Sequence, residues 1–120
     1  MKSRSPNRWR GLAAAYATFV FAASVAPLAA PAPAGLYFDK AAHLVVYVIL
    51  AWLLLRAWRT SGRQSGDGLT VWVVATAYGA MIELVQSMLP WRSAEAADLL
   101  VNAAGAGLGV WAGFRLTESR

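Results

Sequence analysis

Residues 69–89, LTVWVVATAYGAMIELVQSML, form an apolar run in which the one charged residue is Glu83. About 20 residues of α-helix cross the ~30 Å hydrocarbon core of a bilayer, because each residue rises ~1.5 Å. The run lacks the apolar–polar alternation of a half-buried strand. Inside lipid, only helices and closed barrels satisfy every backbone polar group. The run therefore predicts a transmembrane helix.

Three further apolar runs of similar length occupy residues 11–30, 41–58 and 97–114. The last run is the weakest, since it is rich in alanine and glycine and carries polar residues near its start. Of the 120 residues, 58% are hydrophobic and 14% are charged, against about 45–50% and roughly 25% in soluble domains. A soluble chain this short cannot bury so much apolar surface. We predict an all-α bundle of four transmembrane helices in a single domain, residues 1–120.

Lysine and arginine are distributed unevenly between the two ends of the predicted bundle. Two of the 11, Lys40 and Arg92, lie at one end, and the other nine lie at the end that holds both termini. Because positively charged loops stay in the cytoplasm, we expect both termini to be cytoplasmic. This topology accounts for the net charge of +5, so we expect no nucleic-acid partner. The nine are Lys2, Arg4, Arg8, Arg10, Arg56, Arg59, Arg63, Arg115 and Arg120.

The first run also has features of a cleaved signal peptide. A basic start precedes the apolar stretch, and Ala32-Pro33-Ala34 follows it. However, the stretch is longer than the ~7–15 residues of a signal-peptide core, and a proline stands inside the cleavage motif. We therefore expect the first run to remain in the protein. Cleavage would leave three spans with the same polar residues.

Polar residues gather near the outer, non-cytoplasmic end of the second, third and fourth predicted helices. Residues three, four and seven apart share a helix face, and these residues follow that spacing. A charged group at the centre of a membrane helix costs at least ~2.5–3.5 kcal/mol, so such groups face the bundle interior or a wet cavity. We predict one shared cleft that opens to the outer side. The residues placed around this cleft are His43 of the second helix, Glu83 and Gln86 of the third, Arg92 in the turn, and Asp98 and Asn102 of the fourth. Asp39, Lys40 and Tyr47, on the same stripe of the second helix as His43, complete the nine candidate site residues.

The same polar residues also have structural interpretations. Asp39 and Lys40 precede a helix, where a capping residue and an interfacial charge are common. His43 can bridge two helices through a hydrogen bond. Glu83 can form an ion pair with Arg92 or with His43.

Three glycines on the fourth predicted helix, Gly105, Gly109 and Gly113, share one face at intervals of four. Small residues at this spacing let two membrane helices approach closely. We expect this face to pack against another helix and to carry no chemistry.

Four short motifs follow one another along the chain. They are Asp39-Lys40-x-x-His43-x-x-x-Tyr47, Gly79-x-x-x-Glu83-x-x-Gln86, Pro90-x-Arg92 and Asp98-x-x-x-Asn102-x-x-Gly105-x-x-x-Gly109. In this order and spacing the chain resembles, over residues 12–114, the VanZ-like family of small bacterial membrane proteins. The family is named for an accessory factor in teicoplanin resistance. The resemblance implies a multi-helix inner-membrane protein linked to the cell envelope. The phosphotransbutyrylase label of some members has no counterpart here, because the chain lacks a phosphate-cradling glycine loop with a lysine.

The polar residues favour a site that binds or processes an envelope precursor, either a lipid-linked phosphate or a peptidoglycan precursor, at the outer leaflet. Arg92, helped by Lys40, can hold a phosphate or carboxylate. His43 can act as a general acid or base, because imidazole titrates near neutral pH, and Glu83 would orient or charge-balance it. The remaining polar residues of the group would position the ligand. The sequence leaves open whether any reaction is catalysed. With one histidine and no cysteine it predicts no metal, and we expect no cofactor.

Two other functions fit the sequence. The polar residues can serve only to lock the helices together in a membrane module that binds a partner. Alternatively, the chain can be a small proton-coupled exporter centred on Glu83. An exporter needs access from both sides of the membrane, whereas the predicted cleft opens to one side. The sequence does not indicate an oligomeric state.

Overall fold

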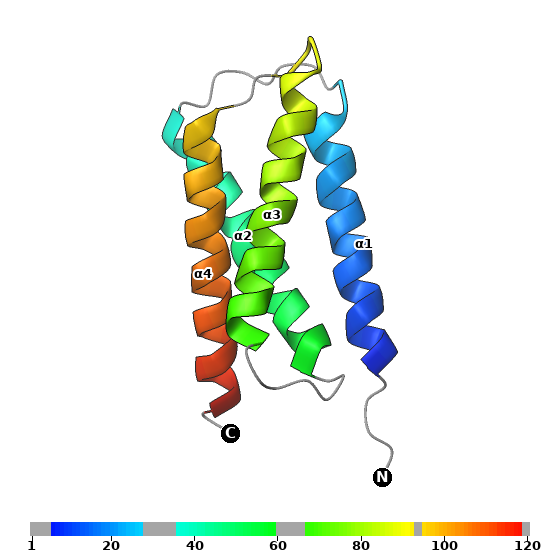
Figure 1. The fold of residues 1–120 in the computed structure, drawn as a ribbon, viewed down its shortest axis with the longest axis vertical. Helices are drawn as coiled ribbons and strands as arrows, with labels where there is room; N and C mark the ends of the chain where they lie inside the picture. Colours follow the sequence, from blue (N-terminus) through cyan, green and yellow to red (C-terminus); the bar gives the residue numbers. More distant parts are fainter. Residues whose placement is uncertain (1–5, 28–35, 60–66, 93–94, 119–120) are drawn as a thin grey trace.

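The computed structural model describes residues 6–27, 36–59, 67–92 and 95–118. Its helices are α1 (Pro6–Val25), α2 (Leu36–Arg59), α3 (Asp67–Ser87) and α4 (Ala96–Glu118). They run alternately up and down, so α1 begins and α4 ends at the same end of the bundle (Figure 1). The all-α prediction is confirmed for the described part of the chain.

Three stretches of the described residues are long and apolar enough to cross a membrane, namely Lys40–Arg59, Asp67–Ser87 and Ala96–Leu116. α1 is not among them, because it is the least apolar of the four helices and carries two arginines near its start. The three stretches match the predicted second, third and fourth spans in position.

The outer surface of the bundle is apolar. Phe19, Met88 and Leu100 each expose more than two thirds of their surface, at 68%, 69% and 73%. Soluble monomers rarely expose apolar patches this continuous, whereas helices in lipid do so as a rule. The exterior therefore suits contact with lipid.

α1 is displaced toward the N-terminus relative to the predicted run 11–30. Pro6 stands at its first position, where a missing N–H is tolerated. The helix ends at Val25 because Pro27 disfavours helical geometry in the residue before it. The helix therefore ends before residue 30, the predicted end of this run. Residues 28–30, which complete the predicted run, and the motif Ala32-Pro33-Ala34 lie outside the described residues.

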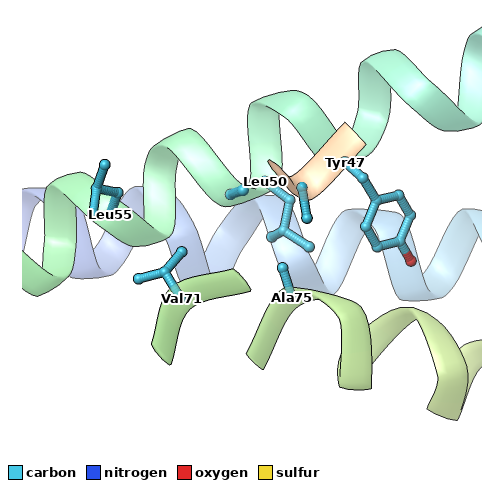
Figure 2. Packing of buried hydrophobic residues seen from close by; sticks show 7 residues of the cluster. Tyr47, Leu50, Leu55, Val71 and Ala75 are labelled. Carbon is cyan, nitrogen blue, oxygen red and sulfur yellow. The ribbon is translucent and has the colours of Figure 1, made fainter. Parts of the chain in front are cut away.

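The core lies between α2, α3 and α4. Tyr47, Leu50 and Leu55 of α2 point toward Val71 and Ala75 of α3, and all five are almost fully buried (Figure 2). The small side chains of Ala51, Ala75 and Ala106 belong to the same buried cluster and let the three helix backbones approach closely. α2 is thus the central helix, and it contacts each of the other three.

The most extensive helix contact joins α2 to α4 through the predicted glycine face. A Cβ atom added to Gly105 would lie 2.6 Å from the carbonyl oxygen of Leu44. A Cβ added to Gly109 would overlap the carbonyl oxygen of Val48. The predicted close packing is confirmed, and it brings the polar residues of α4 against those of α2.

Candidate functional site

A cavity of about 230 Å³ lies where α3 ends and α4 begins, between side chains from all four helices. α1 forms one wall with Phe19, Val20, Ala23 and Ser24. Six of the nine residues predicted to form a site line this cavity. They are His43, Tyr47, Glu83, Gln86, Arg92 and Asn102.

Lys40 takes part in a cluster of charges beside the cavity and does not line it. Its Nζ atom donates hydrogen bonds to Oε1 of Glu95 and Oδ1 of Asp98, each at 2.5 Å. The Asp98 side chain is 7% exposed, whereas that of Glu95 is 49% exposed. This pairing differs from the predicted role of Lys40, in which its ammonium helps Arg92 to hold a phosphate.

His43 connects the charge cluster to the cavity. Its Nδ1 atom lies 3.3 Å from Oδ1 of Asn102. An amide oxygen only accepts hydrogen bonds, so Nδ1 carries the proton in this contact. Nε2 lies 3.8 Å from Oδ2 of Asp98. The carboxylate beside the imidazole is therefore that of Asp98, whereas the sequence predicts Glu83 in this role.

Glu83 lines the cavity from α3 and ties that helix to the start of α4. Its Oε1 atom accepts a hydrogen bond from the backbone N–H of Glu95 at 3.1 Å. The carbonyl of Glu95 in turn accepts a bond from the N–H of Asp98 at 3.0 Å. Among the described residues, Glu83 forms no ion pair with Arg92, which was one of the two pairings that the sequence suggested.

Side chains from the end of α3 and the turn after it cap the C-terminal carbonyls of α1. Because Pro27 has no N–H, the carbonyl of Ala23 lacks its usual helical donor, and Nη2 of Arg92 donates to it at 2.6 Å. The same Nη2 donates to the carbonyl of Ala26 at 3.0 Å.

Two further side chains also donate to carbonyls at the end of α1. Gln86 donates to the carbonyl of Ser24, and Trp91 donates to that of Val25, each at 2.9 Å.

Arg92 keeps unused donors after these contacts. Its Nε atom is buried and has no hydrogen-bond partner. Within the described part of the chain, no carboxylate lies at ion-pair distance from its guanidinium. A half-buried positive charge without a carboxylate partner thus borders the cavity, and an anion is the group that would satisfy it.

Several residues of this region had no clear signal in the sequence. Glu95 lies in a polar turn, where a carboxylate is ordinary, although its place three residues before Asp98 is typical of a helix start. α1 contributes apolar side chains to the cavity wall and backbone carbonyls as acceptors, and neither contribution can be recognised from the sequence. Asp39 lies in the first turn of α2, but its side chain is outside the described part of the structure.

The two carboxylates on Lys40 predict unequal losses of stability. Asp98→Asn is expected to lower the melting temperature several times more than Glu95→Gln, because it leaves a half-buried ammonium without its buried partner. Glu95 is exposed, and exposed ion pairs contribute little. Thermal unfolding of the two variants in detergent, followed by tryptophan fluorescence, measures the difference. Equal losses would mean that burial does not distinguish the two pairs.

Comparisons with known proteins agree with the resemblance seen in the sequence. The model of the VanZ/LLP1 family matches residues 4–116, which is nearly the whole chain. No curated protein and no solved structure gives a significant match. Together with the three apolar helices, the family match identifies a membrane protein. The chain belongs to the VanZ/LLP1 family.

Proposed function

We propose that this chain is a four-span protein of the bacterial inner membrane that binds the phosphate-bearing headgroup of a lipid-linked cell-envelope precursor. In this proposal both termini are cytoplasmic and the cavity opens near the periplasmic face. The observation that carries the proposal is the guanidinium of Arg92, which borders the cavity with a buried, unpartnered Nε.

The proposed topology has support in the placement of the arginines. Arg8, Arg56 and Arg115 lie at the end of the bundle where α1 begins and α4 ends, each against a tryptophan ring. Arginine is in excess on the cytoplasmic side of membrane proteins, and tryptophan is enriched at both membrane interfaces. α1 is the least apolar helix, yet its arginines lie in its first turns, so an apolar stretch remains to cross the lipid beside its three partners.

The mixture of groups around the cavity favours a headgroup that has both a phosphate and hydroxyls. Arg92 offers hydrogen-bond donors to an anion. The carboxylate of Glu83 would repel a fully ionised anion but would accept a hydrogen bond from a hydroxyl or from a protonated phosphate oxygen. Gln86 and Asn102 offer both kinds of group. A lipid-linked, phosphorylated precursor presents this combination beside an apolar tail.

Titration of the purified protein with two lipids tests the proposal. Native mass spectrometry would compare polyprenyl phosphate with polyprenol of the same chain length. We expect the phosphate form to bind at least about tenfold more tightly, because a charge-assisted contact with a half-buried guanidinium contributes on the order of 1.5–3 kcal/mol. Equal binding of the two lipids would contradict the proposal.

A structural role is the second candidate, and a specific observation favours it. Gln86 and Arg92 donate to carbonyls of α1, and His43 contacts Asn102 of α4, so each also joins two helices. If locking the helices is their whole function, His43→Ala would lower the melting temperature, and the protein would bind neither lipid. Under the first proposal, His43→Ala weakens binding of polyprenyl phosphate with little change in melting temperature.

A further inference from the structure

Two arginine side chains, those of Arg8 and Arg56, lie against the ring of Trp9 at the end of the bundle opposite the cavity. The Cζ atom of Arg56 lies 4.4 Å from the ring centroid of Trp9 and 5.4 Å from that of Trp52. The Cζ atom of Arg8 lies 5.8 Å from the Trp9 centroid. The two indole rings meet edge to face, with centroids 5.8 Å apart and planes at 88°. We call these four residues the Trp9 cluster.

The positive charge of the Trp9 cluster is not compensated by a carboxylate. Within the described ranges, neither Arg8 nor Arg56 has a hydrogen bond or an ion pair. An aromatic face attracts a guanidinium, but it leaves the charge and the in-plane N–H donors unsatisfied. The cluster also lies beside the N-terminus of α1, which is the positive end of the helix dipole.

We propose that the Trp9 cluster binds the phosphate of an anionic phospholipid in the leaflet at this end of the bundle. Guanidinium groups match phosphate oxygens through paired N–H donors, and tryptophan rings settle at headgroup depth. Trp9, Trp52 and Arg56 are half-buried between α1 and α2, so packing holds these three side chains in place before a lipid arrives. Arg8 is exposed and completes the headgroup contact from the rim.

The chain contains a matched arginine for comparison. Arg115 lies at the same end of the bundle, with its Cζ atom 5.7 Å from the ring centroid of Trp111. It is a single arginine on the ring of Trp111, which is 60% exposed, and among the described residues no second ring packs against that one. If any interfacial arginine attracted anionic lipid equally, Arg115 would matter as much as Arg56.

Native mass spectrometry of the delipidated full-length protein tests this proposal. Phosphatidylglycerol is titrated against phosphatidylcholine with the same acyl chains. We expect preferential binding of phosphatidylglycerol, and we expect Arg56→Gln or Arg8→Gln to weaken it about fivefold each. Arg115→Gln should leave it nearly unchanged. Because Arg8 is exposed, Arg8→Gln remains informative if Arg56→Gln fails to fold.

Three results would overturn the inference. They are equal binding of the two lipids, a loss with Arg115→Gln as large as that with Arg56→Gln, and displacement of phosphatidylglycerol by excess inorganic phosphate, which would indicate a site for free anions. None of these results depends on the cavity at the other end of the bundle, so this inference and the proposed function can fail separately.

Discussion

Replacing Gly109 with alanine is expected to destabilise the folded protein by about 1–3 kcal/mol, a typical cost of overpacking. The new methyl group would overlap the carbonyl oxygen of Val48, and a backbone oxygen cannot rotate away as a side chain can. It would also lie 3.0 Å from the Cβ of Ala51. α2 and α4 must therefore separate, which loosens the most extensive contact in the bundle. Thermal or chemical unfolding in detergent measures the loss.

Gly107 provides the matched control on the same helix. A Cβ added there would lie 3.6 Å from Nε1 of Trp72, which is ordinary van der Waals contact. Gly107→Ala should therefore be neutral or slightly stabilising, because alanine is favoured over glycine within helices by about 1 kcal/mol. If Gly107→Ala and Gly109→Ala lower the stability equally, the stability does not depend on the close approach of α2 to α4 at Gly109.

Replacing Arg92 with glutamine is expected to weaken binding of polyprenyl phosphate about a hundredfold. This prediction rests on the proposed function, and its size follows from the roughly 2–5 kcal/mol that removing one partner of a buried charge contact costs. Glutamine keeps hydrogen-bond donors but has no charge. Arg92→Lys, which restores the charge without the planar fork, should recover part of the affinity. Native mass spectrometry with the same two lipids measures both variants.

Arg92 also caps α1, so a control must separate loss of the ligand contact from loosening of that helix. Trp91→Phe removes a neighbouring cap, the bond from Trp91 to the carbonyl of Val25, and leaves the charge in place. It should lower the melting temperature slightly and leave lipid binding intact. If Trp91→Phe reduces binding as much as Arg92→Gln does, the guanidinium acts through α1 and does not contact the phosphate.

The helical architecture could be predicted from the sequence because lipid imposes strict demands on composition and length. Three of the four runs match helices that are apolar enough to span a membrane. The helix in the first run ends at Val25, earlier than its apolar composition predicts, because apolar residues continue past Pro27 whereas this proline restricts the backbone before it. The glycine face of α4 was recognised because its spacing has one simple structural explanation.

The residues that border the cavity could be singled out because each is polar within an apolar run. Helical spacing placed His43 of α2 and Asn102 of α4 at the same depth, and the structure brings them into contact. The partners of the charged groups could not be predicted. Whether Lys40 joins Arg92 at a ligand or pairs with the carboxylates of Glu95 and Asp98 depends on distances between helices, which periodicity does not contain.

The caps on α1 have a consequence for how the protein is made. The final turn of α1 takes its donors from Gln86, Trp91 and Arg92, which lie about 60 residues later in the chain and are therefore synthesised later. Until those residues arrive, the exposed carbonyls must find water or headgroups at the bilayer surface. In the four-span topology that we propose, α1 would therefore reach its final position in the bilayer only after the end of α3 has been synthesised.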